Sequence, residues 1–140
     1  MKLKRAFALA LLLLALSCSS AAVPYGPRML ESGLTIQELV VPDGPAVETG
    51  QAIKVHYTGT LPTGEVFDST VERGQPLSFV VGASEVPPGL DQGVLGMRLY
   101  GRRKLIAPIE LMFPTGIPPE LVDVTRVYVV VEVLEIQGPG

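Results

Sequence analysis

The side chains with the clearest chemical potential lie between residues 55 and 70. This stretch reads V-H-Y-T-G-T-L-P-T-G-E-V-F-D-S-T: a strand pattern, a tight turn and a return strand that ends on Phe67 and Asp68. An aromatic ring gains free energy by leaving water, whereas a carboxylate loses free energy unless it keeps a polar partner. The pair therefore predicts the edge of an apolar pocket, and we place Tyr57 and Arg73 at the same edge.

The chain lacks the residue sets that most common enzymatic reactions require. His56 is the only histidine, Cys18 is the only cysteine, and no paired acidic spacing builds a metal cage. The sequence holds no G-x-S-x-G elbow, no phosphate-binding loop and no dinucleotide fingerprint. His56 has no acid or thiol at a recognisable spacing, and strand alternation places it on the solvent face. We therefore expect no metal and no cofactor.

The charge distribution argues against nucleic acid as a partner. The net charge of the 140-residue chain is −3, with 11 basic and 14 acidic residues. Lys2, Lys4 and Arg5 belong to the N-terminal segment, so eight basic residues and 14 acidic ones remain, which gives −6 for the rest. Affinity for nucleic acid comes mainly from Lys and Arg on phosphates. The one later basic cluster, at 98–104, is predicted to lie mostly on a solvated strand face.

The pocket residues need a sheet to position them. In residues 52–60, Ile53, Val55 and Tyr57 alternate with polar residues, which predicts a strand with one buried face. Similar patterns predict strands at 34–41, 76–81, 103–109 and 126–136, and Pro/Gly clusters predict turns at 42–45 and 61–64. The last strand is apolar on both faces, so we expect it at the centre of the sheet.

A short helix completes the predicted domain. Leu90, Val94 and Met97 recur at i, i+4 and i+7 and form one apolar stripe, although Gly93 and Gly96 each cost a helix about 1 kcal/mol. We predict an α+β fold in which five or six mostly antiparallel strands form a twisted sheet that curls around this helix. The long apolar connection at 110–125 is typical of a binding loop.

The N-terminal segment has the pattern of a secretory signal. Three basic residues precede an uncharged run at 6–16, and small residues follow. We predict a signal peptide at 1–17. Cys18 then resembles the lipidated cysteine of a bacterial lipoprotein, and residues 18–32 would form a flexible tether. The alternative is ordinary cleavage after Ala22, which leaves a soluble exported protein.

One family resemblance accounts for the whole domain. The motif V-H-Y-T-G-x-L-x-x-G-x-x-F-D-S resembles the hallmark of FKBP-type peptidyl-prolyl cis/trans isomerases. Later segments agree with it: G-L-D-Q-G-V-L-G-M at 89–97, G-R-R-K-L at 101–105 and V-E-V-L at 131–134. The resemblance covers residues 33–137 and leaves 138–140 as a C-terminal tail.

The resemblance implies the reaction and the roles of the site residues. It implies rotation of X-Pro bonds in proline-containing polypeptide segments, without a cofactor, by a monomer. Phe67 would line the pocket wall and Asp68 would face the substrate carbonyl, while Tyr57 and Arg73 would hold Asp68 in place and ionised. A purely structural alternative is that Asp68 and Arg73 form a buried ion pair that only ties down the loop.

The opposite side of the pocket departs from the family pattern. Leu90 stands where a Trp floor is common, and Pro87, which has no backbone N–H, replaces an Ile that binds ligand through its N–H. Phe113 keeps the ring of a ligand-binding Tyr but lacks its hydroxyl, whereas Val86 matches the usual Val. Two further aromatic positions carry aliphatic residues, Leu77 and Val129. These changes predict weak binding of macrolides such as tacrolimus and low isomerase activity.

Two functions from different classes remain open at this point. The first is an exported, lipid-anchored prolyl isomerase that assists protein folding in the cell envelope or periplasm, with outer-membrane anchoring through Cys18. The second is a non-catalytic binding or chaperone module that holds proline-containing segments in the same groove. The preserved Tyr57, Phe67, Asp68 and Arg73 favour the first, whereas Pro87, Leu90 and Phe113 favour the second.

Overall fold

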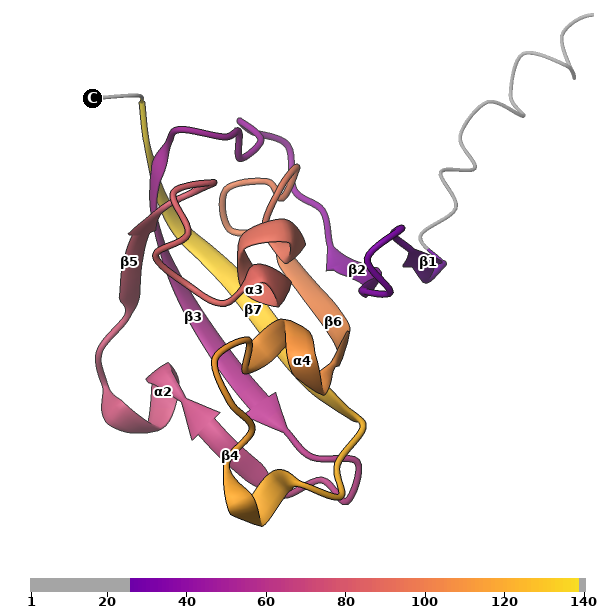
Figure 1. Ribbon diagram of the computed structural model, residues 1–140. Helices are drawn as coiled ribbons and strands as arrows, with labels where there is room; N and C mark the ends of the chain where they lie inside the picture. The colour runs from indigo at the N-terminus through magenta and orange to yellow at the C-terminus, as the bar shows by residue number, and fades with distance from the viewer. Residues whose placement is uncertain (1–25, 139–140) are drawn as a thin grey trace, which may run out of the picture.

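The computed structural model describes residues 26–138, which form an open, twisted antiparallel sheet (Figure 1). The strands are β1 (Arg28–Met29), β2 (Thr35–Val40), β3 (Ala52–Thr60), β4 (Val66–Ser69), β5 (Leu77–Val80), β6 (Arg102–Pro108) and β7 (Arg126–Gln137). Their order is β1-β2-β6-β7-β3-β4, and β5 also pairs with β3. Because β7 lies between β6 and β3, the prediction of a central final strand is confirmed.

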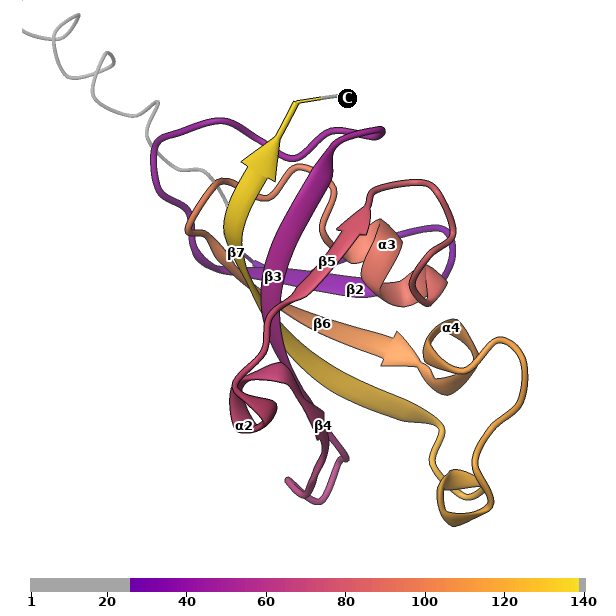
Figure 2. The same ribbon diagram turned by 90° about the vertical axis from the view of Figure 1, so that its left-hand side faces the viewer.

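The helices are short. They are α2 (Thr70–Arg73), α3 (Pro88–Gly93), α4 (Ile109–Met112) and the 3-10 helix η3 (Pro119–Leu121). Figure 2 shows α3 and α4 on the same side of the sheet. The β3–β4 hairpin and the segment after α4 project from one end of the molecule (Figure 1). Of the helices, the sequence patterns indicate only α3, because the other three are too short to show a repeating apolar stripe.

The predicted helix is shorter than its apolar stripe. Helix α3 ends at Gly93, so Val94 lies in the turn that follows it and Met97 lies just beyond that turn. A Cβ on Gly93 would lie 2.5 Å from Leu105 Cδ1, so the glycine lets the helix approach β6 closely, and Gly96 has a φ of +79°. Leu90, Val94 and Met97 are nevertheless buried together in the core, as the stripe predicted.

The basic residues at 98–104 were predicted to lie mostly on a solvated face. Arg103 does not lie there, because it is only 2% exposed. Its Nε donates to Glu38 Oε1 at 2.7 Å, its Nη2 pairs with the same carboxylate, and its Nη1 donates to the carbonyls of Gly93 and Leu95 at 2.8 Å each. Arg103 therefore ties β2 and the end of α3 to β6. An alternating strand pattern cannot show this, because the partners come from other elements.

The N-terminal part of the described chain joins the sheet. Within the segment predicted as a tether, β1 pairs with β2 through Arg28↔Ile36 and Met29↔Thr35. The predicted signal peptide, Cys18 and most of the predicted C-terminal tail lie outside the described residues. Between residues 26 and 138, no helix is long and apolar enough to cross a membrane.

Candidate active site

A small apolar cavity lies between the helices and the concave part of the sheet. Its volume is about 130 Å³. It is lined by Tyr57, Gly59, Phe67, Asp68, Leu77, Pro87, Leu90, Met112, Phe113 and Val129. Strands β3, β4, β5 and β7 supply one side, and α3, α4 and the residues that flank them supply the other. The side chains are apolar except at the edge, where Tyr57 and Asp68 stand.

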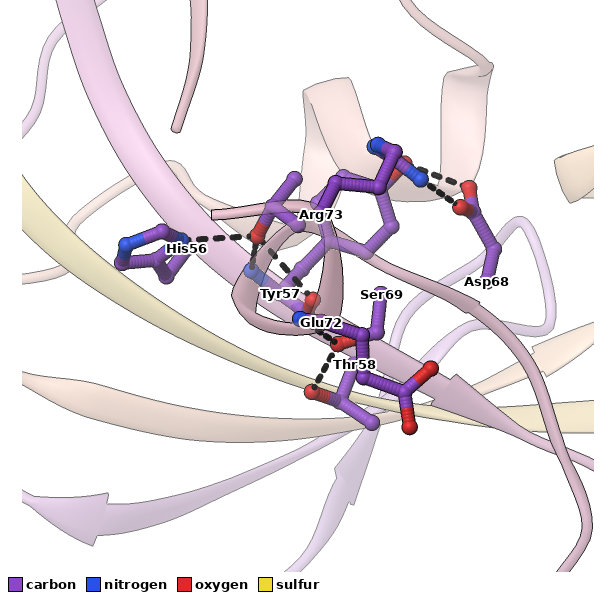
Figure 3. A network of polar contacts seen from close by, with 8 residues as sticks. His56, Tyr57, Thr58, Asp68, Ser69, Glu72 and Arg73 are labelled. Carbon is purple, nitrogen blue, oxygen red and sulfur yellow. Dashed lines mark hydrogen bonds and ion pairs between the residues drawn. The ribbon is translucent and has the colours of Figure 1, made fainter. Parts of the chain in front are cut away.

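Three side chains form a polar group at that edge (Figure 3). The Tyr57 hydroxyl donates to Asp68 Oδ2 at 2.5 Å, and Arg73 Nη1 forms an ion pair with Asp68 Oδ1. Arg73 Nη2 also donates to Tyr57 Oη at 3.3 Å, and its guanidinium lies 5.9 Å from the centre of the Tyr57 ring. Both oxygens of the Asp68 carboxylate are therefore fixed by partners from other elements.

This polar group is half-exposed. The side chains of Asp68 and Arg73 are 38% and 52% exposed. The alternative of a buried ion pair is therefore wrong in its burial, and an exposed pair of this kind contributes little to stability because water screens it. Burial raises the pKa of Tyr57, and its hydrogen bond to Asp68 raises it further, so the phenol stays protonated and remains a donor.

Helix α2 places Arg73 next to Asp68. The Ser69 side chain caps the helix by accepting from the Glu72 N–H at 3.2 Å, and Gly74 ends it in the left-handed conformation with a φ of 68°. Buried Thr70 accepts from the Tyr57 N–H at 2.8 Å and lies 2.9 Å from His56 Nδ1. His56 is thus partly buried against α2 rather than fully on the solvent face.

Two aromatic rings line the cavity and contact each other in a tilted arrangement. The rings of Phe67 and Phe113 are 6.1 Å apart, with an angle of 50° between their planes. Leu90 and Val129, which are 3% and 1% exposed, close the bottom. Pro87 precedes α3 and accepts from the N–H groups of Leu90 and Asp91 at 3.0 Å each. The site is therefore preformed by packing, with no charged group inside it.

Gly59 gives the Phe67 ring its place. A Cβ on Gly59 would lie 2.7 Å from Phe67 Cζ, a distance that real Cβ contacts do not show. We expect Gly59→Ala to displace the ring and to destabilise the fold by about 1–3 kcal/mol, because the added methyl group would overlap the ring and force it out of its packed position. Denaturant unfolding measures this cost. Gly138→Ala is the control, since a Cβ there meets nothing within 4 Å; equal stability of the two variants would contradict the prediction.

Eight of the ten predicted site residues meet at the cavity. They are Tyr57, Phe67, Asp68, Leu77, Pro87, Leu90, Phe113 and Val129. Arg73 does not line it but stands behind Asp68 and Tyr57, and Val86 is partly buried against the core beside Pro87. The placement of these residues leaves their roles as predictions.

Two lining residues were missed by the sequence analysis. Gly59 shares the Tyr57 face by strand alternation and lies inside the family motif, so its position could have been predicted. Met112 gives no such signal, because it enters the cavity only through the turn of α4, which has no repeating pattern.

A larger hollow, of about 670 Å³, lies elsewhere on the molecule. It is bounded by the N-terminal segment, β2 and the turns at 41–44 and 96–98, and it shares no residue with the smaller cavity. Arg28, Glu38, Asp43, Arg98 and Arg103 give it a mixed charge. Small-molecule sites are usually enclosed and mostly apolar, so the smaller cavity is the better candidate. Within residues 26–138, no group of three or more His, Cys, Asp or Glu could hold a metal ion.

Comparisons of sequence identify related proteins. The family model described as "FKBP-type peptidyl-prolyl cis-trans isomerase" matches residues 44–122. An FK506-binding protein 2 of Dictyostelium discoideum is 44% identical over 112 residues, which cover 78% of this chain and 80% of that protein. An FK506-binding protein of Streptomyces anulatus is 47% identical over 81 residues, or 57% of this chain and 65% of that protein.

Some relatives are much longer than the matched region. The chain spans 39% of the chloroplastic peptidyl-prolyl cis-trans isomerase FKBP16-3 of Arabidopsis thaliana, with 40% identity over 87 residues, which are 62% of this chain. Among solved structures, AtFKBP13 has a TM-score of 0.67 at 33% identity and covers 81% of this chain and 99% of its own. FkpA from Escherichia coli has a TM-score of 0.69 at 31% identity and covers 85% of this chain and 55% of its own.

Proposed function

This chain belongs to the FKBP-type peptidyl-prolyl cis-trans isomerase family, and we propose that it accelerates rotation about X-Pro bonds in proline-containing polypeptide segments. The observation that carries the proposal is the apolar cavity of about 130 Å³ with the fixed Asp68 carboxylate at its edge. The cavity accepts a small apolar ring, and the carboxylate marks where the peptide backbone enters.

The reaction needs no nucleophile and no cofactor. Rotation of the peptide bond breaks amide resonance, which gives a barrier of about 18–20 kcal/mol. Water stabilises the planar, dipolar amide more than the twisted one, so an apolar pocket that removes this water lowers the barrier. Phe67, Leu90, Phe113 and Val129 supply that pocket, and the proline ring would occupy the cavity that these side chains line.

The position of the Asp68 carboxylate favours the twisted state of the substrate amide. Its carboxylate faces the substrate carbonyl group, and a fixed charge that needs no reorganisation can favour the changed charge distribution of the twisted amide. Tyr57 and Arg73 hold both carboxylate oxygens, so the orientation is set before substrate binds. The hydrogen bonds to Tyr57 and Asp68 raise the pKa of Arg73, which keeps the guanidinium charged.

A protease-coupled assay with short X-Pro peptides tests the proposal. The protease cleaves only the trans peptide, so a faster second phase in the presence of the chain reports isomerisation. We expect acceleration that grows linearly with protein concentration. A second phase that stays at the uncatalysed rate would exclude the enzyme.

The alternative function is a binding module that holds proline-containing segments without catalysis. It is favoured by Pro87, which has no N–H to offer to a bound backbone, and by Leu90 and Phe113, which offer no donor. The two functions differ in one result. A binding module would show peptide binding in a titration and no acceleration in the coupled assay.

We expect the double variant Leu90→Trp, Phe113→Tyr to be about tenfold more active than the unmodified chain. An aromatic floor buries more of the proline ring, and a tyrosine hydroxyl can donate to the substrate backbone, which is worth about 1 kcal/mol. The coupled assay measures kcat/KM. Leu77→Ile is the matched control for a change in the lining without a new ring or donor. A double variant with unchanged kcat/KM would mean that these positions do not touch substrate.

The same differences bear on macrolide binding. Several relatives carry the name FK506-binding protein, among them those of Streptomyces anulatus and Dictyostelium discoideum. We extend weak binding of this kind of ligand to the present chain. The absence of a donor at Pro87 and at the Phe113 ring is the reason for the low affinity, since a ligand carbonyl that loses its donor is left unpaired.

Export to the cell envelope is the location that the N-terminal sequence favours, and the relative FKBP16-3 of Arabidopsis thaliana is named as chloroplastic. In this proposal Cys18 carries the lipid anchor, the domain covers 33–137, and the protein acts as a monomer on exported clients. The alternative is a soluble periplasmic or secreted protein that results from cleavage after Ala22.

We expect Cys18→Ala to move the protein from the membrane fraction to the soluble fraction of the producing cells, because acyl chains on Cys18 are its anchor. Cell fractionation followed by immunoblotting measures the distribution. Ser20→Ala is the control. A Cys18→Ala protein that stays in the membrane fraction would contradict lipid anchoring.

A further inference from the structure

We infer that Met112 is a modification site: a hydroperoxide oxidises its thioether to the sulfoxide, and the added oxygen weakens the cavity's hold on a proline ring. The inference rests on the proposed function, because it concerns the same cavity. It proposes that oxidation weakens binding in that cavity and that Met112 is the side chain that is oxidised.

The position of Met112 carries the inference. It is the last residue of α4, and it lines the cavity together with Leu90 and Phe113. Its sulfur lies 2.7 Å from the point that a Cβ on Gly89 would occupy, so the thioether rests on the first turn of α3. The side chain is partly buried, and its cavity face can be reached by a molecule as small as hydrogen peroxide.

The other described methionines are not equivalent. Met29 is 73% exposed and lies on β1, away from the cavity, so its oxidation does not touch the site. Met97 is 1% exposed within the core, where a peroxide does not reach the sulfur. Met1 lies outside the described residues. Among residues 26–138, only Met112 combines partial access with a place in the cavity lining.

The chemical step is balanced without a cofactor. A sulfur lone pair attacks the terminal peroxide oxygen, the S–O bond forms and the O–O bond breaks. The sulfur is oxidised by two electrons, and hydrogen peroxide is reduced to water, with proton transfer to the leaving hydroxide. The product is reversible by methionine sulfoxide reductases, which act on one sulfoxide epimer each.

Packing directs the effect of the new oxygen. On the α3 side, the sulfur is already in contact with Gly89, and the carbonyl oxygen of Leu111 lies 3.3 Å from the same point, so no space is left there for another oxygen. The sulfoxide oxygen must therefore point toward the cavity or the side chain must leave it. In either case an apolar wall becomes polar or is lost, and a polar group facing a bound apolar ring without a donor is costly.

The test uses the full chain treated with hydrogen peroxide and, in parallel, two variants. Peptide mapping by mass spectrometry locates the added oxygen. The kcat/KM of each protein is compared with its own untreated value, and the affinity for a proline-containing peptide is followed by NMR titration. Met112→Leu removes the sulfur but keeps an apolar chain of similar volume, whereas Met29→Leu removes an exposed sulfur far from the cavity. Cys18 is present in all three proteins, so its oxidation cancels in the comparison.

We expect oxidised wild-type protein and oxidised Met29→Leu to lose about tenfold in kcat/KM and in peptide affinity. We expect oxidised Met112→Leu to change by less than about twofold, and a mixture of both classes of reductase to restore the wild type. Equal losses in Met112→Leu and wild type would overturn the inference, as would unchanged peptide affinity in protein whose Met112 carries the oxygen. If the untreated chain binds the peptide without accelerating its isomerisation, the proposed enzymatic function is wrong. The comparison of peptide affinities then still decides the inference about Met112.

Discussion

Phe67→Ala is expected to lower kcat/KM for X-Pro isomerisation by about a hundredfold. The ring lines the cavity, and it packs on Gly59 and contacts Phe113, with the ring centres 6.1 Å apart. Loss of an aromatic side chain from a packed site costs about 3 kcal/mol. If this energy is lost in the transition state, the rate falls by about two powers of ten.

The measurement must separate the site from the fold. Val66 precedes Phe67 on β4, but it is 38% exposed and is absent from the cavity lining. Val66→Ala is therefore the matched control and should keep its activity. Both variants are assayed well below their unfolding transitions, which circular dichroism locates. A folded Phe67→Ala protein with activity within about threefold of the unmodified chain would remove the ring from the mechanism.

Glu38→Ala is expected to destabilise the domain by about 3–5 kcal/mol, the largest effect on stability that we predict for one ion pair. Glu38 accepts from Nε and pairs with Nη2 of Arg103, whose side chain is 3% exposed. Without Glu38, a guanidinium charge stays buried with only the carbonyl oxygens of Gly93 and Leu95 as partners. Urea unfolding followed by far-UV circular dichroism measures the change in the unfolding midpoint.

An exposed ion pair of the same chain provides the control. Lys54 and Glu135 are 3.1 Å apart, and their side chains are 44% and 45% exposed. Glu135→Ala should change stability much less than Glu38→Ala, because water already screens this pair. The double variant Glu38→Ala, Arg103→Met should recover much of the loss, since the uncompensated charge is gone. Equal losses of stability for Glu38→Ala and Glu135→Ala would contradict a stabilising role of the Glu38–Arg103 ion pair.

Arg103 also links the stability of the fold to the site. Its Nη1 holds the carbonyl groups at the end of α3, and Leu90 on the same helix closes the bottom of the cavity. The hydrogen bonds of Arg103 therefore hold helix α3, which carries Leu90, in place. Arg103 itself does not line the cavity. A glycine-containing helix of six residues has little stability of its own, so tertiary contacts of this kind must hold it.

Local sequence patterns predict the strands and the hairpin, because these elements depend on residues that are close together in the chain. Alternation at 52–60 predicts β3 with the bounds that the structure shows, and the apolar final strand predicts its central place. The hairpin motif brings Tyr57, Phe67 and Asp68 together, because antiparallel pairing of neighbouring strands fixes which residues face each other. The other lining residues that were predicted came from the family resemblance, which placed Leu77, Pro87, Leu90, Phe113 and Val129 at the pocket.

Tertiary structure decides the features whose partners are distant in the chain. The burial of Arg103 depends on Glu38, 65 residues away, and on carbonyl groups at the end of α3. The entry of Met112 into the cavity depends on a four-residue helix that packs on Gly89. Arg73 on α2 also contacts Tyr57, which lies 16 residues earlier in the chain. A periodic pattern reports only which face of an element is apolar, whereas the burial of a charge and the shape of a cavity are set by the elements packed against that face.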